Sequence, residues 1–421
     1  MTPNVQVVED HYNVFPYPTV TSLMQPLPGP FKRGWLNYLL RRRRGEILRP
    51  DADIWIAGCG TQQGIHWALC FPEATVVATD VSETALGIAD GLASQLGLTN
   101  VRFEKQDLMQ PYLADAFDLI VSTGVVHHLP DPAIGLSHIH TGLRPGGAAL
   151  LMVYSTMHRE PLAVFRRALA LLAHDDEDTD ARYALAGRLL QTLLSAERCS
   201  PPCPGALEQL WQHFQSDRSL VADALLHPLE QTYDIDALLT LLADTSFQHV
   251  SWLHPAHWQL DAYLQDPDLL ARFNRLNSMQ QANAVYHMAG YAGPLLEFLA
   301  ESTEALARPA YTQDELLAMP VVCSEGSEAY RVEEGRIVAK GRRPAYEVQG
   351  EELVGHSTSG FGAKQTWRVP AYVEPVLLAC DGTCTLGDIL DAFANDFDRQ
   401  QLFDLLYTFL PHDLGLLVPA W

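Results

Sequence analysis

The chain has 421 residues, of which 48% are hydrophobic, a length that suggests about two or three domains with a full buried core. It carries 28 Lys and Arg against 51 Asp and Glu, a formal net charge of −23 that disfavours binding to nucleic acid and to anionic membranes. The start, "MTPNVQVVEDHYNVF", does not resemble a signal peptide and the apolar runs are short, so we expect a cytoplasmic protein without membrane contact.

Residues 1–50 are predicted to form an N-terminal cap that is first irregular and then helical. Prolines in "FPYPTV" and "QPLPGP" disfavour regular helix. "FKRGWLNYLLRRRR" then predicts a helix that ends in a basic cluster at 41–44. We expect this cluster to be the solvated face of the helix; the alternative is a local anchor for an acidic ligand.

Residues 52 to about 155 alternate between short apolar strands and helices. Strands are expected at "DIWIAG", "TVVATD", "VRFEKQD", "FDLIVSTG" and "GAALLMVY", and helices at "SETALGIADGLASQLG" and "DPAIGLSHIHTGLR". This alternation predicts an α/β fold with a doubly wound, mostly parallel sheet. Such sheets bind ligands beyond the carboxyl ends of their strands, where Gly58, Asp80, Asp107 and Thr123 fall.

The remaining half is predicted to add a helical insertion, two strands and a small module. Residues from about 156 to 245 look helical, interrupted by the acidic segment "HDDEDTDAR". "HVSWLHP" and "PLLEFLAE" are expected to be strands that complete the sheet, with the helix "SMQQANAVYHMAG" between them, so that the α/β domain spans 51–305. Residues 311–421 are expected to form a separate α+β module, with a hairpin "YRVEEGRIV" that turns at Glu334 and Gly335 and two amphipathic helices.

The stretch "DIWIAGCGTQQG" indicates where a ligand binds. Gly58 and Gly60 allow a tight turn with close ligand approach, and the helix that follows offers free amides to a negative group. Asp80 ends the second strand 20 residues after Gly60, where an acid can accept both hydroxyls of a ribose. These features fit both NAD and S-adenosylmethionine.

Two later segments, "FDLIVSTGVVHHLPDP" and "LRPGGAALLMVYS", favour the second ligand. With them the sequence resembles the class I S-adenosylmethionine-dependent methyltransferases, clearly over residues about 10–155 and loosely to about 300. The resemblance implies a seven-stranded Rossmann-like sheet, a helical substrate cover, S-adenosylmethionine as cofactor and S-adenosylhomocysteine as product. The cofactor residues that it implies are Gly58, Cys59, Gly60, Asp80, Val81, Gln106, Asp107, Leu108, Thr123 and Gly124.

The N-terminal segment "EDHYNVFPYP" resembles one that closes over the cofactor in some relatives. Tyr12 and Tyr17 are therefore predicted to lie at the methionine end, and packing under the proline turn is the alternative. The sequence departs from the family at Ala57, where many members carry an acid near the methionine amino group. That contact must then come from elsewhere in the chain.

Three residues are predicted to take part in catalysis: His127, His128 and Tyr154. A histidine with a pKa near ~6.5 suits the deprotonation of a phenol, acid or thiol. Because "HHL" recurs in such enzymes whatever their substrate, the pair is alternatively a brace for the loop. Tyr154 is placed at the mouth of the site, with a rim role as its alternative. Trp211, Phe214 and Tyr233 either line an aromatic pocket or pack in the core.

The C-terminal segment from about 370 to 418, with "VLLACDGTCTLGDILDAF", resembles winged-helix-like domains that bind leader peptides in ribosomal-peptide modification. Dimerisation or packing is the alternative, so a homodimer stays open. The pairs Cys199/Cys203 and Cys380/Cys384 are spaced too widely for an ordinary zinc site, and we expect reduced thiols and no metal. The expected substrate is a small molecule or a peptide. An NAD-linked oxidoreductase and a non-catalytic cofactor-binding protein remain alternatives.

Overall fold

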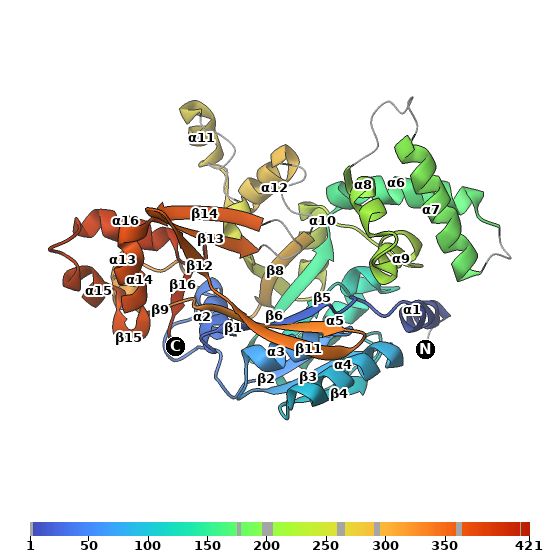
Figure 1. The fold of residues 1–421 in the computed structure, drawn as a ribbon, viewed down its shortest axis with the longest axis horizontal. Coiled ribbons are helices and arrows are strands. Elements are labelled where there is room, and N and C mark those ends of the chain that lie inside the picture. Colours follow the sequence, from blue (N-terminus) through green and yellow to red (C-terminus); the bar gives the residue numbers. More distant parts are fainter. Residues whose placement is uncertain are drawn as a thin grey trace.

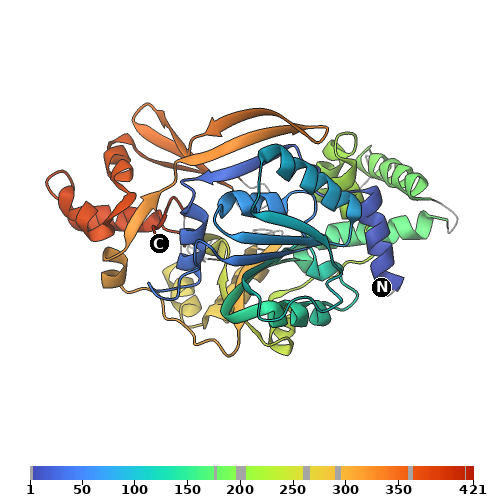
Figure 2. The same cartoon turned by 90° about the horizontal axis from the view of Figure 1, so that it is seen from below.

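The computed structural model describes the chain except for residues 1–2, 175–177, 196–204, 259–265, 290–294, 359–363 and 413. Its helices and strands surround one large central sheet (Figure 1). The helical region that follows the sheet's parallel strands and the C-terminal helices lie at opposite ends of the molecule in both ribbon views (Figures 1 and 2).

The central sheet has seven strands in the order β4-β3-β2-β5-β6-β8-β7. Their bounds are β2 (Asp53–Ala57), β3 (Thr75–Asp80), β4 (Val101–Lys105), β5 (Phe117–Thr123), β6 (Leu143–Tyr154), β7 (Phe247–Trp252) and β8 (Leu295–Ser302). Strands β2 to β6 pair in parallel, whereas β8 runs antiparallel to both β6 and β7. The predicted doubly wound, mostly parallel sheet is thus confirmed, and the chain order reverses beside β2, where such sheets bind ligands.

Three helices connect the parallel strands: α3 (Gln63–Cys70), α4 (Glu83–Leu96) and α5 (Pro132–Gly142). Their ends follow from local chemistry. The side chain of Ser82 caps α4 by accepting the Ala85 amide, and Gly97 ends the helix with a φ of 67°. Asp131 caps α5 in the same way, immediately before a proline.

The predicted helical insertion is also confirmed. It consists of α6 (Thr156–Leu172), α7 (Thr179–Ser195), α8 (Gly205–His213), α9 (Arg218–Leu226) and α10 (Ile235–Asp244). Helices η2 (Pro255–Trp258), α11 (Pro267–Phe273) and α12 (Ser278–Ala289) precede β8. Trp211 and Phe214 pack in the apolar cluster of this region, and Tyr233 packs against the sheet, so all three are core residues.

The N-terminal segment forms α1 (Pro3–Val14), β1 (Ser22–Leu27) and α2 (Phe31–Leu39). Two predictions were wrong here. The start is helical rather than irregular, and α2 ends before the basic cluster, because Arg41 takes a left-handed φ of 54°. Arg42 is buried and pairs with Glu301 at 3.1 Å, while Arg43 pairs with Glu315 at 3.1 Å. Arg42 and Arg43 therefore pair with carboxylates of the chain itself, while Arg41 and Arg44 are exposed.

The C-terminal region is less separate than predicted. The hairpin of β10 (Gly326–Glu333) and β11 (Arg336–Arg343) turns at Glu334 and Gly335, with φ of 48° and 74°, as expected. However, β10 pairs with β1 in a three-stranded sheet, and the side-chain amide of Gln95 on α4 donates to the Gly335 carbonyl. The hairpin is thereby joined to the central domain.

In the described part of the C-terminal region, the remaining elements are four helices, one 3-10 helix and six strands. They are α13 (Gln313–Leu317), β9 (Pro320–Cys323), β12 (Tyr346–Gln349), β13 (Glu352–Thr358), β14 (Lys364–Pro370), η4 (Ala371–Val373), α14 (Glu374–Ala379), β15 (Asp381–Thr385), α15 (Leu386–Ala392), α16 (Arg399–Thr408) and β16 (Leu417–Pro419). The strands form two three-stranded sheets, β12-β13-β14 and β15-β9-β16. The winged-helix-like resemblance of this region stays a prediction.

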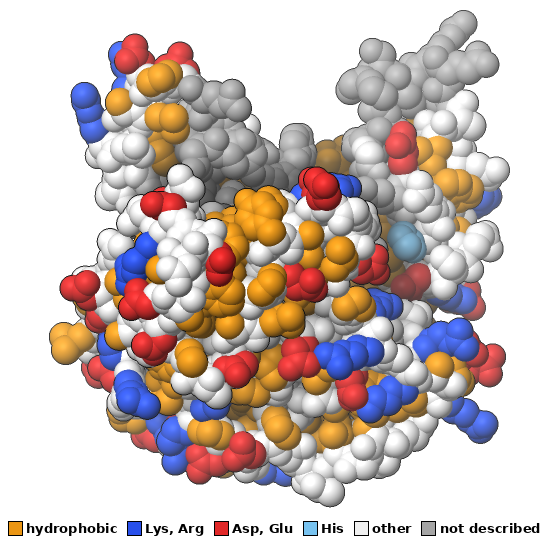
Figure 3. Space-filling view, turned by 60° about the vertical axis from the view of Figure 1, so that its left-hand side comes forward, with side chains coloured by type: hydrophobic (Ala, Val, Ile, Leu, Met, Phe, Trp, Pro, Cys, Tyr) orange, Lys and Arg blue, Asp and Glu red, His pale blue; other side chains and the backbone are white. Residues whose placement is uncertain are grey.

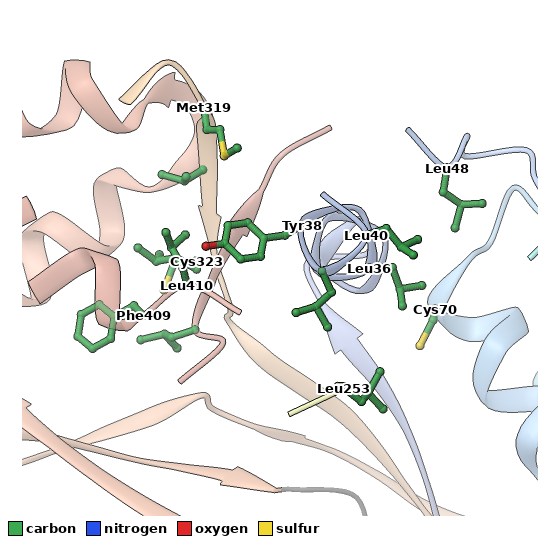
Figure 4. Close-up of a cluster of buried hydrophobic side chains, with 14 of the residues drawn as sticks. Leu36, Tyr38, Leu40, Leu48, Cys70, Leu253, Met319, Cys323, Phe409 and Leu410 are labelled. Atoms are coloured by element: carbon green, nitrogen blue, oxygen red, sulfur yellow. The ribbon is translucent and has the colours of Figure 1, made fainter. Parts of the chain in front are cut away.

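Helix α2 joins the two parts through one hydrophobic core (Figure 4). Tyr38 points toward Phe409 and Leu410 of the C-terminal region, whereas Leu36 and Leu40 lie toward the central domain (Figure 4). On the face in Figure 3, acidic and basic side chains of the described residues are interspersed, so that face shows no extended patch of one sign.

Candidate active site

A cavity of about 320 Å³ lies at the carboxyl ends of the parallel strands. This is the place, beside the glycine loop, where the sequence predicts that a ligand binds. All twelve predicted cofactor residues line it: Tyr12, Tyr17, Gly58, Cys59, Gly60, Asp80, Val81, Gln106, Asp107, Leu108, Thr123 and Gly124. Of the three predicted catalytic residues, His128 and Tyr154 also line it. The fold therefore brings the N-terminal segment and four strand ends to one place.

The glycine loop after β2 has no room for side chains. Gly58 and Gly60 have φ of 79° and 52°, a region that other residues rarely adopt. A Cβ on Gly60 would lie 2.5 Å from the Tyr17 carbonyl oxygen, and one on Gly58 would lie 2.1 Å from a methyl of Val125. The same Tyr17 carbonyl accepts the Thr61 amide at 3.2 Å. The N-terminal segment is thus fixed over the loop, which needs both glycines.

Asp80 is oriented by backbone amides from two sides. Its Oδ2 accepts the Gly60 amide at 2.8 Å, and its Oδ1 accepts the Ser82 amide at 2.9 Å. Burial raises the pKa of this carboxyl, and the amide hydrogen bonds oppose that effect. Each oxygen keeps further acceptor capacity toward the cavity, which is the arrangement needed to accept two neighbouring hydroxyls.

Helix α1 covers the cavity and is fixed to the strand ends. The Asn13 side-chain oxygen accepts the Ser82 hydroxyl at 2.9 Å, and Lys105 pairs with Glu9 at 2.7 Å. These contacts place Tyr12 over the cavity wall. Its hydroxyl donates to Asp223 Oδ1 at 2.9 Å.

Asp223, on α9, is a cavity residue that the sequence analysis missed. It is only 3% exposed, and its second oxygen accepts the Tyr154 hydroxyl at 3.1 Å. Burial, followed by the charge of Asp223, raises the pKa of both Tyr12 and Tyr154 well above the usual value, so both hydroxyls remain donors at neutral pH. The available signal was an acid within the otherwise apolar run "LVADALL".

The two predicted histidines are placed differently. His128 lines the cavity, and its Nδ1 lies 2.6 Å from the Leu229 carbonyl oxygen, so Nδ1 carries the proton and Nε2 is the basic nitrogen. His127 is fully buried behind the cavity wall, with its ring 3.8 Å from that of Tyr154. Burial lowers the pKa of both rings, which keeps them neutral at pH 7. Of the two histidines, only His128 lines the cavity.

Comparison with known proteins identifies the domain that holds this cavity. The family described as "Methyltransferase domain" matches residues 56–151. The chain contains a class I S-adenosylmethionine-dependent methyltransferase domain. The match runs from the end of β2 into β6 and includes the glycine loop, Asp80 and the histidine pair.

Relatives of the methyltransferase domain are found by sequence and by structure. An uncharacterised protein of Synechococcus sp. is 28% identical over 66% of this chain and 67% of its own length. The trans-aconitate 2-methyltransferase of Deinococcus radiodurans is 39% identical over 25% of this chain and 39% of its own length. The structure of PKMT2 from Rickettsia typhi shares the fold, with a TM-score of 0.64 at 13% identity over 96% of this chain and 76% of that chain. The curated methyltransferases are matched over only two-fifths to about half of their own length.

A second missed residue, Glu297 on β8, also lines the cavity of the methyltransferase domain. Burial raises the pKa of its carboxyl to about 7, although the nearby Lys32 opposes that shift. In the sequence, Glu297 lies in "PLLEFLAE", where no local feature distinguishes it from an ordinary polar residue of a strand. Asp223 and Glu297 are thus two acids that line the cavity from outside the parallel strands.

Neither a metal site nor a disulfide is found among the described residues. Cys380 is buried and Cys384 exposed, and both are free thiols; Cys199 and Cys203 lie outside the described residues. In the same part of the chain, every helix is too short or too polar to cross a membrane.

Proposed function

We propose that this protein transfers the methyl group of S-adenosylmethionine to a small molecule or a peptide. The observation that carries the proposal is the cavity lined by all the residues that the class I resemblance implies for the cofactor. A protein of the same fold, PKMT2 from Rickettsia typhi, is known in complex with AdoHcy, which supports the choice of cofactor. We also propose that catalysis involves His127, His128 and Tyr154. The methyltransferase domain then spans residues 51–305, between an N-terminal cap of residues 1–50 and a C-terminal module of residues 311–421.

The residues of the cavity suit the parts of the cofactor in order. The Asp80 carboxylate would hold the ribose hydroxyls, and Gln106, Asp107 and Leu108 would contact the adenine. The amides of the glycine loop would meet the methionine carboxylate at the start of α3. The rings of Tyr12 and Tyr154 would face the sulfonium, because aromatic faces attract a cation without attacking it.

Bound S-adenosylmethionine supplies an electrophilic methyl group. The protein's largest contribution is positioning, which can lower a barrier by about 7–11 kcal/mol when donor and acceptor are aligned. The cover of α1 and α9, which the Tyr12–Asp223 hydrogen bond joins, would keep water from the cation, whose charge disperses during transfer. His128, neutral and with Nε2 as its basic nitrogen, is a base candidate for an acceptor that must lose a proton.

The first test is ligand binding by calorimetry, with S-adenosylhomocysteine and NADH as the two probes. We expect S-adenosylhomocysteine to bind and NADH not to bind. The second test incubates the protein with methyl-labelled S-adenosylmethionine and extracts of small molecules or peptides, followed by mass spectrometry. Binding of NADH alone would favour an oxidoreductase. Binding without any labelled product across these acceptors would favour a non-catalytic cofactor-binding protein.

A further inference from the structure

Glu297 comes from β8, which is farther from β2 in the sheet order than any other strand that contributes to the cavity. The sheet order β2-β5-β6-β8 separates β8 from β5 by one intervening strand, a distance of about 10 Å across the sheet. The adenosine residues come from β3 and β4 and the methionine residues from β2 and β5. The side of β6 and β8 therefore remains for the molecule that receives the methyl group.

The side chain of Glu297 faces this space from a fixed position. Glu297 and Met152 are directly opposite each other in the β6–β8 ladder, so both side chains point to the same face of the sheet, and both line the cavity. The backbone of Glu297 is held on its other side, where its carbonyl accepts the Leu253 amide at 2.9 Å. The position of the carboxyl is thus set by a strand that is paired on both sides, and not by a loop.

The carboxyl of Glu297 accepts no hydrogen bond within the described part of the chain, which distinguishes it from the other acids at the site. Asp80 accepts two backbone amides and Asp223 two tyrosine hydroxyls. The charged or titratable groups that face Glu297 are Lys32 from α2 and His254 after β7. His254 Nε2 lies 3.7 Å from the carboxyl, but burial lowers the pKa of His254 to about 4, so this histidine is neutral at pH 7. Lys32 lies farther away, with its Nζ 4.1 Å from the centre of the Trp35 ring.

We propose that Glu297 is the group that faces the methyl acceptor and takes its proton, an inference that rests on the proposed function. As the acceptor's heteroatom bonds to the methyl carbon, the C–S electron pair stays on sulfur and neutralises the sulfonium. The acceptor's proton passes to the Glu297 carboxylate, which becomes a carboxylic acid and later returns the proton to water. A base works best when its pKa is near the working pH, and the pKa of Glu297, about 7, meets that condition better than the lowered pKa of His128.

The test uses sinefungin, a cofactor analogue, so the acceptor need not be known. Sinefungin carries an amine-bearing carbon where S-adenosylmethionine carries the methyl-bearing sulfur, so its amine takes the place of the transferred methyl group. Its ammonium therefore reports on the group that faces the transferred methyl. The quantity measured is the ratio of sinefungin affinity to S-adenosylhomocysteine affinity, by calorimetry between pH 6 and pH 8. As Glu297 ionises with rising pH, we expect this ratio to increase by about tenfold in the unaltered protein. In Glu297→Gln the ratio should be low and independent of pH.

Asp223→Asn is the matched control, since it neutralises the other acid of this part of the cavity, and we expect it to keep the rise with pH. The inference is overturned if the ratio is flat in the unaltered protein, or if Asp223→Asn rather than Glu297→Gln abolishes the rise. It is also overturned if Glu297→Gln weakens both ligands equally, because Glu297 would then hold the methionine end. If S-adenosylhomocysteine fails to bind the unaltered protein, the proposed function fails instead. Thermal unfolding of both variants verifies that they are folded.

Discussion

The two ends of the cavity are built in different ways. The end proposed for adenosine is lined by residues between Gly58 and Leu108, which follow three successive strands, and its Asp80 carboxylate is held by two backbone amides. The opposite end joins Tyr12, Tyr154, Asp223 and Glu297, which come from α1, β6, α9 and β8. The comparison teaches that the βα topology places most residues of the proposed cofactor end, to which the N-terminal segment adds Tyr17, whereas the proposed acceptor end depends on how remote segments pack over it.

The strongest way to break the cofactor end is Gly60→Val. The new side chain would meet the Tyr17 carbonyl oxygen, 2.5 Å from the Cβ position, at a backbone φ of 52° that valine disfavours. Because the loop and the N-terminal segment must both move, we expect S-adenosylhomocysteine affinity to fall by about a thousandfold. Calorimetry measures this loss. Gly91→Ala, on α4 with open space at its Cβ position, should leave the affinity unchanged. A loss below about tenfold would show that the loop does not approach the cofactor.

At the proposed acceptor end, the largest expected effect is that of Glu297 on the pH dependence of the free energy of unfolding. Burial raises the pKa of Glu297 to about 7, with Lys32 opposing, from the ordinary 4.5. At Glu297 the folded protein then binds more protons than the unfolded chain between these values, so the contribution of Glu297 to stability is largest below pH 4.5 and is lost as pH rises through 7. Glu297→Gln removes this loss. We expect the free energy of unfolding of the variant, relative to the unaltered protein, to rise by about 3 kcal/mol between pH 4.5 and pH 8.

Urea unfolding at several pH values measures that difference. Glu304→Gln is a suitable control, because Glu304 is exposed at the surface beyond β8. An offset between Glu297→Gln and the unaltered protein that does not change with pH would mean that Glu297 already ionises normally, and the acceptor end would lose its distinguishing acid.

The same contrast explains what the sequence could predict. Gly58, Gly60 and Asp80 follow from strand period, loop glycines and a fixed spacing, which are local properties, and all three line the cavity. Asp223 interrupts an apolar run, but that pattern does not show which cavity the acid faces, and Glu297 carries no local signal, since an acid in a strand is ordinarily a solvated residue. Arg42 was misjudged for a related reason: its burial depends on Glu301 and the Gly146 carbonyl, both remote in sequence. The hairpin turn at Gly335 was predictable, but its pairing with β1 was not.

Asp80→Asn sharpens the assignment of the cofactor end. The amide would keep one acceptor oxygen but would lose the charge and one acceptor site for the ribose hydroxyls. We expect S-adenosylhomocysteine binding to weaken by about 1–3 kcal/mol, or roughly tenfold to a hundredfold. Calorimetry compares it with Asp90→Asn, an exposed position on α4. If both variants bind equally well, Asp80 serves only to shape the loop through the Gly60 amide.

The smallest expected effect is that of Tyr154→Phe, a variant that tests whether the Asp223 hydrogen bonds support the cofactor or only the fold. Tyr154→Phe removes one of the two hydroxyls that hydrogen-bond to the Asp223 carboxylate, and leaves that of Tyr12 in place. We expect a loss of about 1 kcal/mol in the free energy of unfolding, because one hydrogen bond to a buried group is removed while the ring stays and the Tyr12 hydroxyl still donates. Tyr372→Phe, which is 64% exposed, serves as the control.

The double variant Tyr12→Phe/Tyr154→Phe should cost more than the sum of the single variants, since Asp223 would then be buried without either donor. S-adenosylhomocysteine affinity of Tyr154→Phe should change by less than about twofold, because the adenosine contacts lie on the other strands. A large loss of affinity in Tyr154→Phe would mean that the Asp223 group supports the cofactor itself. The boundary between the two ends would then lie at β8, with Glu297 alone on the acceptor side.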